Sequence, residues 1–256
     1  MIKRLILGDI HGHNTWKDII DKENPQEIII LGDYFDSFGI KSEDQIKNFK
    51  NILEFRKVFN KDSKYESMKL IMGNHDFHYI HNINEHYSGW NQNTYNAICD
   101  IFIDCIDHEI FKMCIFDEIN NTLYSHAGVS NAWIVKRCNN SSLYDINSLD
   151  YNYFKFTFAE GGDYYGSSPL NSPIWIRPES LLKNPIRYKG KILTQIVGHT
   201  HLREKPLIKE FNSSIIDEEN EIGKLYVIDT LPKYYMIEEL NENNIIMKRN
   251  IKSFNI

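Results

Sequence analysis

Short apolar runs alternate with longer amphipathic stretches through the first half of the chain. The apolar runs consist mainly of Ile, Leu and Met and occupy residues 4–7, 27–31 and 69–72. Runs of this kind, without an alternating polar face, are typical of strands covered on both sides in a parallel or mixed sheet. The amphipathic stretches that follow them predict helices at 15–22, 43–60 and 93–106. The repeated strand and helix order therefore predicts an α/β fold.

The second half has a different pattern, in which apolar and polar residues alternate along short stretches separated by Asn-Asn and Glu-Asn turns. This alternation predicts antiparallel hairpins. The predicted strands are 109–117, 122–125, 192–197, 213–217, 224–229, 234–240 and 244–250. The segment at 139–191 is rich in loops and aromatic residues and contains Gly161 and Gly162, which is typical of a cap or long loop beside a site.

Composition places the chain among folded globular proteins. Of its 256 residues, 42% are apolar and 25% are charged, which excludes fibrous and disordered classes. We expect one domain over residues 1–256, because this length is sufficient for a single sizeable core. The four cysteines do not have metal or redox spacing, so we expect them to be reduced core residues. They are Cys99, Cys105, Cys114 and Cys138.

Charge and hydropathy limit the partners and the location. The net charge is -6, with 29 Lys plus Arg against 35 Asp plus Glu, so no binding of duplex nucleic acid is expected. The longest apolar runs are far shorter than the roughly 20 residues that span a bilayer. The first predicted strand begins almost at Met1 and leaves no room for a leader. We therefore expect a cytoplasmic protein without a membrane partner.

Chemically active side chains follow the apolar runs and are flanked by glycine. The segments are GDIHG at 8–12, GDYFD at 32–36, GNHD at 73–76, SHAG at 125–128 and GHTH at 198–201. The carboxyl ends of strands gather at one edge of an open α/β sheet, so the side chains of the first three segments should converge. Two Asp, one Asn and four His among the five segments have the character of metal ligands, which are too many for one ion. They are Asp9, Asp33, Asn74, His11, His126, His199 and His201. A pair of divalent ions that share a carboxylate fits this set better.

This ordered set of five segments resembles the calcineurin-like metallophosphoesterase superfamily over roughly residues 4–230. The resemblance implies a four-layer α/β fold with two mixed sheets flanked by helices and a site at the strand carboxyl ends. It also implies that Asp33 bridges two metal ions. The ligands implied for the first ion are Asp9, His11 and His201, and those for the second are Asn74, His126 and His199. Manganese is the metal expected first, with iron, zinc, cobalt or nickel as alternatives, since such ligands accept all of them.

The resemblance also implies catalytic roles in a phosphoesterase that uses a metal-activated hydroxide. His75 matches the family histidine that protonates the leaving oxygen, and Asp36 matches the carboxylate that orients it. His78 and His81 follow His75 in a predicted helix. Helical neighbours lie three or four residues apart, so only one of the two can lie near His75. We expect each to be either structural or a residue that contacts the site residues without binding metal or substrate.

A finer resemblance is to bacterial and phage-type serine/threonine phosphoprotein phosphatases. It depends on GDYFD, on the IWIRP segment at 174–178 and on YVIDT at 226–230. In that branch an arginine after the tryptophan contacts phosphoryl oxygens, which makes Arg177 the candidate phosphate clamp. The chain departs from the branch at Ser37 and Phe38, where an Arg-Gly pair is usual, and at Asp76, which replaces Glu.

Three functions follow from these matches. The first is hydrolysis of phosphate monoesters, with a phosphoprotein or a small molecule as substrate. The second is a nucleotide phosphohydrolase or phosphodiesterase that cleaves a diadenosine polyphosphate or a cyclic nucleotide, which GHTH and the missing arginine favour. The third is a catalytically inactive protein-binding scaffold. The complete ligand set counts against the third, because inactive members usually lose ligands.

Overall fold

The computed structural model describes most of the chain, and contacts divide it into two compact units. The described residues are 1–61, 67–81, 83, 85–137, 143, 146, 156–157, 163–211, 223–230 and 233–254. The first unit is Met1–Lys112 with Thr230–Ile256, and the second is Met113–Asp229. Several sequence-based expectations lie outside the described residues, namely those for Cys138, Gly161, Gly162 and the strand at 213–217.

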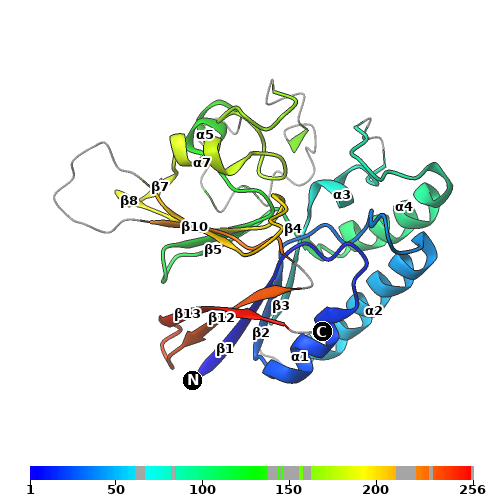
Figure 1. Ribbon diagram of the computed structural model, residues 1–256, viewed down its shortest axis with the longest axis horizontal. Coiled ribbons are helices and arrows are strands. Elements are labelled where there is room, and N and C mark those ends of the chain that lie inside the picture. Colours follow the sequence, from blue (N-terminus) through cyan, green and yellow to red (C-terminus); the bar gives the residue numbers. More distant parts are fainter. Residues whose placement is uncertain are drawn as a thin grey trace. The chain divides into compact units, whose positions relative to one another are not determined.

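The first unit is built on a six-stranded mixed sheet in the order β13-β12-β1-β2-β3-β4. The strands are β1 (Ile2–Leu7), β2 (Glu27–Ile30), β3 (Met68–Ile71), β4 (Phe111–Lys112), β12 (Tyr234–Leu240) and β13 (Ile246–Ser253). Strands β1 to β4 run parallel, β12 runs antiparallel to β1, and β13 runs antiparallel to β12. The helices are α1 (Thr15–Glu23), α2 (Ser42–Lys61), α3 (Asn74–Phe77) and α4 (Gln92–Asp107). Figure 1 shows α1, α2 and α4 lying together beside this sheet.

Burial on both faces explains why β1, β2 and β3 are apolar runs. Leu7, Ile30 and Leu70 lie on one face of the sheet, Ile6 and its partner Ile29 lie on the other, and all five are buried. In the parallel register Leu7 pairs with Ile30, and Ile30 pairs with Leu70. The three strands therefore end at the same edge of the sheet, and the segments that follow them begin side by side.

The end of α1 is tied to the sheet by a buried carboxylate. Glu23 accepts hydrogen bonds from Tyr235 Oη of β12 at 2.7 Å and from Lys252 Nζ of β13 at 2.9 Å. The helix ends at Asn24, whose φ of 46° lies in the left-handed region that asparagine tolerates. These contacts join segments from the two ends of the chain.

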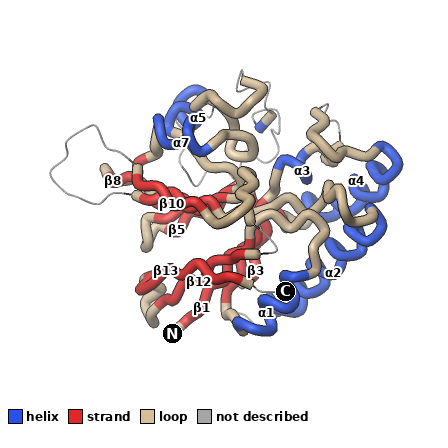
Figure 2. Tube along the Cα trace, viewed as in Figure 1, coloured by secondary structure: helices blue, strands red, loops and turns tan. Residues whose placement is uncertain are grey.

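The second unit contains a five-stranded mixed sheet in the order β10-β11-β9-β6-β5 and a two-stranded ribbon of β7 and β8. The strands are β5 (Cys114–Asp117), β6 (Thr122–Ser125), β7 (Arg187–Tyr188), β8 (Lys191–Ile192), β9 (Thr194–Val197), β10 (Leu207–Glu210) and β11 (Lys224–Val227). Helices α5 (Asn131–Arg137) and α7 (Pro178–Lys183) lie on the same side of the five-stranded sheet in Figure 2. Ile176, Leu181, Val197 and Leu225 belong to the core of this unit.

The α/β class with mixed sheets flanked by helices is confirmed, and two details of the sequence prediction are wrong. The single strand predicted at 109–117 is divided at Met113, because β4 and β5 belong to different sheets. The strand predicted at 192–197 is likewise divided into β8 and β9. The second half also contains parallel pairs, which the alternating pattern did not predict, since the central strand β9 runs parallel to both of its neighbours.

Other expectations from the sequence agree with the structure. The pairs β5–β6 and β12–β13 are antiparallel, as the alternating pattern predicts. Strand β11 pairs antiparallel with β10, a strand that the pattern did not predict. Cys99, Cys105 and Cys114 are free and buried, and burial raises the pKa of the Cys105 thiol to about 12. Within the described ranges, the helices are all too short or too polar to cross a bilayer.

Candidate active site

Two loops at the sheet edge of the first unit bring together a group of three potential metal ligands. Asp9 and His11 follow β1, and Asp33 follows β2. Their ligand atoms all lie within 4.8 Å of one another. The backbone N–H groups of Ile10 and His11 donate to the Asp33 carbonyl oxygen at 3.0 and 2.7 Å, so backbone hydrogen bonds hold the two loops together. Carboxylate and imidazole donors at this separation fit a divalent cation.

The contacts of the His11 ring identify the nitrogen that can bind a metal. Nδ1 lies 2.6 Å from the Phe35 carbonyl oxygen, which can only accept a hydrogen bond. Nδ1 therefore carries the proton, and Nε2, which lies 3.7 Å from Asp33 Oδ2, has the lone pair. A metal-bound histidine usually donates its other ring N–H in this way.

Unusual backbone conformations concentrate in the same loops. His11 has a φ of 40°, Asp33 of 51° and Asp36 of 66°. Positive φ is uncommon for residues other than glycine, although Asp and His adopt it more readily than most. Strain of this kind persists where the surrounding contacts enforce it, and it clusters at functional sites.

A third segment, after β3, fixes the Asp33 loop through Asp76. The buried Asp76 carboxylate accepts backbone hydrogen bonds from Asp33 at 2.8 Å, Tyr34 at 2.7 Å and Gly73 at 2.8 Å. Burial and the charge of Asp33 raise the pKa of Asp76, and the three N–H donors oppose this rise. Asn74, the first residue of α3, is also buried.

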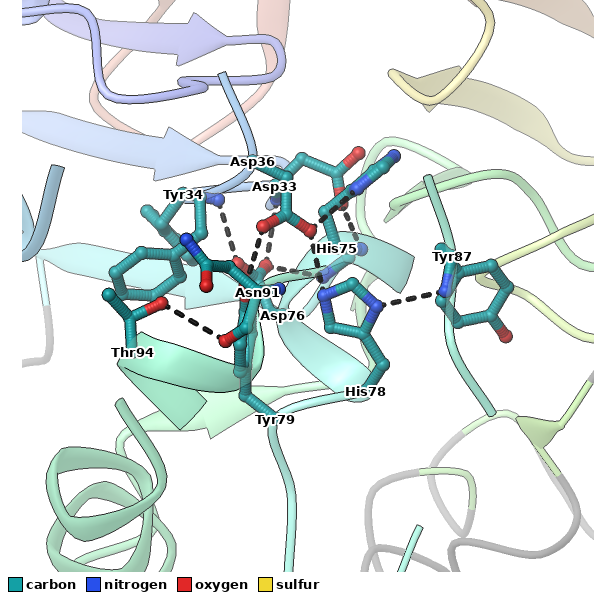
Figure 3. A network of polar contacts seen from close by, with 12 residues as sticks. Asp33, Tyr34, Asp36, His75, Asp76, His78, Tyr79, Tyr87, Asn91 and Thr94 are labelled. Carbon is teal, nitrogen blue, oxygen red and sulfur yellow. Dashed lines mark hydrogen bonds and ion pairs between the residues drawn. The ribbon is translucent and has the colours of Figure 1, made fainter. Parts of the chain in front are cut away.

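His75 forms a pair with Asp36, and this pair adjoins the three-ligand group. His75 Nδ1 lies 2.9 Å from Asp36 Oδ2 (Figure 3). The His75 backbone N–H donates to Asp33 Oδ1 at 2.9 Å, and its ring centroid lies 5.2 Å from that of His11. Since Nδ1 faces the carboxylate, Nε2 is the ring atom that can exchange a proton with another molecule.

The charges of this pair stabilise each other. Burial acts to raise the pKa of Asp36, but hydrogen bonds from His75 and His78 outweigh it and lower the pKa to about 2. Burial acts to lower the pKa of His75, but the charges of Asp33 and Asp36 outweigh it and raise the pKa above the usual 6.5. The pair is therefore a carboxylate and an imidazole that accepts a proton readily.

Two further side chains contact Asp36. No role is predicted from the sequence for Tyr79, and His78 is expected to be either structural or in contact with site residues. Tyr79 Oη donates to Asp36 Oδ1 at 2.7 Å, and His78 Nε2 lies 2.7 Å from Asp36 Oδ2. The available signal was their spacing of three and four residues from His75. As that spacing predicts, only one of the two later histidines approaches His75, because His78 is buried beside it and His81 is exposed.

In the second unit, the structure brings two of the three predicted ligand histidines together. His126 follows β6, His199 follows the parallel neighbour β9, and their ring centroids are 5.1 Å apart. The Gly198 N–H donates to the His126 carbonyl oxygen at 2.7 Å and ties the two loops together. The His201 side chain is 68% exposed, and its Nδ1 lies 3.8 Å from Asp229 Oδ1.

Arg177 lies beside His199 in the second unit. Its Nη1 donates to the His199 carbonyl oxygen and to Thr200 Oγ1, each at 3.4 Å, and its guanidinium lies 5.5 Å from the Trp175 ring centroid. The Trp175 ring in turn lies 5.3 Å from the His199 ring. A planar cation is thus held next to His199, one of the predicted ligands.

The turn after Asp36 has Ser37 and Phe38 at the positions where the phosphoprotein phosphatase pattern has its Arg-Gly pair. Phe38 is 88% exposed. The buried Gln45 side chain braces this turn, since it accepts from the Ser37 N–H at 3.1 Å and donates to the Ile40 carbonyl oxygen at 2.7 Å. The turn itself supplies no cation.

Comparison with known proteins gives a family match. The model of the calcineurin-like phosphoesterase family matches residues 2–203. Among solved structures, a metallophosphoesterase from Sphaerobacter thermophilus is similar, with 13% identity, a TM-score of 0.46 and coverage of 99% of this chain and 88% of that one. The phosphoesterase Yfce from E. coli is similar with 11% identity, a TM-score of 0.34 and coverage of 97% and 98%. No curated protein is significantly similar to this chain in sequence.

Proposed function

The chain belongs to the calcineurin-like phosphoesterase family, and from that premise we propose that this metallophosphoesterase holds two divalent cations and hydrolyses phosphate monoesters. The observation that carries the proposal is the His75–Asp36 pair, which adjoins the Asp9, His11 and Asp33 group. The leaving group of a phosphate monoester departs as an alkoxide or phenoxide, which needs a proton. A histidine beside a metal group can deliver that proton.

The ligands that we propose for the two cations are those that the family segments supply. They are Asp9, His11, Asp33, Asn74, His126, His199 and His201. When bound, the two cations would lower the pKa of a shared water and neutralise charge on the phosphoryl group. Manganese is the first candidate, with iron, zinc, cobalt and nickel as alternatives.

The protein's own groups would then handle the proton and the phosphate. Asp36 accepts the Nδ1–H of His75 and favours its protonated form, so that Nε2–H can be given to the leaving oxygen. After the transfer, His75 remains hydrogen-bonded to Asp36 as the neutral Nδ1–H tautomer. Arg177 supplies the planar N–H donors that suit phosphoryl oxygens.

The substrate that we propose first is a phosphoprotein or a small monoester, because GDYFD and IWIRP match the phosphoprotein phosphatase pattern. The turn at Ser37 and Phe38 supports a second candidate, a nucleotide phosphohydrolase or phosphodiesterase. Ser37 stands at the position of the phosphate-binding arginine, and the exposed ring of Phe38 next to it can contact an aromatic base.

Initial rates on p-nitrophenyl phosphate and bis-p-nitrophenyl phosphate separate these candidates. Both are measured with Mn²⁺ and with a chelator, for the wild type and for His75→Ala. A preference for the monoester that needs metal supports the first candidate, and a preference for the diester supports the second. Turnover that is absent, or that persists with the chelator, would contradict both and favour a binding scaffold.

A further inference from the structure

We infer that His78 is a positioning residue, whose Nε2 lies against Asp36 Oδ2 and so fixes the carboxylate that orients His75. Its effect on catalysis rests on the proposed function, but the arrangement of the His78 ring does not. Figure 3 shows the His78 ring with one nitrogen directed at Asp36 and the other at the backbone of Tyr87.

The backbone of Tyr87 determines which His78 nitrogen carries the proton. The Tyr87 N–H donates to His78 Nδ1 at 3.0 Å, so Nδ1 must offer a lone pair. In the neutral ring the hydrogen is then on Nε2, which lies 2.7 Å from Asp36 Oδ2. Burial is the main cause that lowers the pKa of His78, which supports a neutral ring. His78 therefore places a neutral N–H 2.7 Å from the Asp36 carboxylate without adding a positive charge.

The ring has little freedom to change this arrangement. Its side chain is fully buried, and it packs edge to face against Tyr79 with ring centroids 4.4 Å apart. The ring of Tyr87 lies on another side, with centroids 5.6 Å apart. A residue in such a packed environment can set the orientation of its hydrogen-bond partner.

His78 completes the set of donors around Asp36. Oδ2 faces two imidazole nitrogens, those of His75 and His78, and Oδ1 accepts from Tyr79. If the carboxylate turned over, the oxygen that now faces the two imidazole rings would face only the Tyr79 hydroxyl. A Cβ at Gly89 would lie 2.7 Å from the Asp36 Cβ, so the chain also approaches Asp36 closely there. The direction from Oδ2 to His75 Nδ1 is therefore set in part by His78.

The same three side chains also satisfy a distance criterion for a metal group, since the ligand atoms of Asp36, His75 and His78 lie within 4.8 Å of one another. The N–H groups of the His75 and His78 rings that face Asp36 favour direct contact with its carboxylate over a metal ion between them. Nε2 of His78 carries a hydrogen, and its separation from Oδ2 is that of a hydrogen bond to a charged acceptor.

The kinetic test compares two monoesters whose leaving groups differ in their need for a proton. p-Nitrophenolate is stable as an anion, whereas phenolate has a conjugate acid with a pKa of about 10, like the tyrosine phenol. Because His78 acts through His75, His78→Leu should lower kcat on phenyl phosphate about 10-fold more than kcat on p-nitrophenyl phosphate. His78→Gln, which offers an N–H at a similar reach, should restore the ratio to within about 3-fold of wild type. The matched control is His81→Leu, an exposed histidine on the following turn, which should leave the ratio unchanged.

Equal losses on both esters in His78→Leu, with no recovery in His78→Gln, would show a merely structural role and overturn the inference. Nitrogen-15 NMR of the histidine rings decides the same point without turnover. The wild type should show the Nε2–H tautomer for His78 and a protected Nδ1–H for His75, which His78→Leu should lose. If the wild type hydrolyses neither ester, the proposed function fails, and an Nδ1–H tautomer at His78 would separately refute the positioning role.

Discussion

Gly73→Ala tests whether the segment after β3 sets the position of Asp33. The backbone at Gly73 has φ of -98° and ψ of 178°, which alanine adopts without strain, so the effect of the substitution is purely steric. An added Cβ would lie 2.0 Å from Asp33 Oδ1 and 2.5 Å from the Asp33 backbone nitrogen. Either the Asp33 side chain or the backbone of one of the two loops must therefore move.

The required displacement is large on the scale of a metal site. To reach an ordinary contact of 3.4 Å, Oδ1 must move by about 1.4 Å or the two loops must separate. Either movement breaks the 2.9 Å hydrogen bond from the His75 N–H to Asp33 Oδ1. A misplacement of about 1 Å can cost on the order of 100-fold in rate. We expect overpacking to cost only about 1–3 kcal/mol of unfolding free energy.

The assay measures bound metal by mass spectrometry, kcat on p-nitrophenyl phosphate, and the thermal midpoint. Gly73→Ala should lose bound metal and about 100-fold in kcat while remaining folded. The control is Gly39→Ala, because a Cβ at Gly39 meets nothing within 4 Å. Wild-type metal content and kcat in a folded Gly73→Ala protein would refute the role assigned to Asp33 and its supporting loop.

Three other substitutions test the remaining roles. Asp36→Asn keeps the shape of the side chain but replaces a charge-assisted hydrogen bond with a neutral one, a loss of about 1–2 kcal/mol. We therefore expect kcat on phenyl phosphate to fall about 5- to 30-fold with metal content unchanged. An unaltered kcat would contradict the pairing with His75. Arg177→Ala should raise KM for monoesters about 10-fold, and unchanged KM and kcat would remove Arg177 from the site. Burial acts to raise the pKa of Glu23, but hydrogen bonds from Lys252 and Tyr235 outweigh burial and lower this pKa below 4.5. The stability that Glu23 provides is therefore complete above pH 4.5, and it declines as the pH falls through the lower pKa of the folded state. Glu23→Gln should therefore be about 1–2 kcal/mol less stable than wild type at pH 7 in urea unfolding, with a smaller difference at pH 3; a difference independent of pH would refute this reading.

The convergence of Asp9, His11 and Asp33 could be predicted from the sequence because it depends on a local rule. Each residue follows a short apolar run, and parallel strands in register end at one edge of their sheet. The position of each residue in the loop after its strand then determines where its side chain lies at that edge. Little tertiary information is needed beyond the strand order.

The surroundings of Asp36 could not be predicted in this way. The role of His78 depends on the chain returning so that the Tyr87 N–H meets Nδ1, and on the close approach at Gly89. Such contacts come from the course of a loop, which hydrophobic periodicity does not encode.

Strand partners and short helices were also beyond the sequence pattern. The strand at 234–240 was predicted, but its place beside β1 in the first sheet joins segments more than 200 residues apart. The six-residue helix α7, which begins at Pro178, is too short to show an amphipathic period.

The most direct measurement of the central claim is the rate of p-nitrophenyl phosphate hydrolysis as metal-stripped protein is titrated with Mn²⁺, with bound metal measured on the same samples. We predict no turnover after stripping, a rise with added metal, and a plateau at about two bound ions per chain. Asp33→Asn should reduce both the bound metal and the plateau rate. Hydrolysis that persists in the stripped protein, or a rate that does not follow bound metal, would contradict the assignment of these residues to a metal-dependent phosphoesterase site.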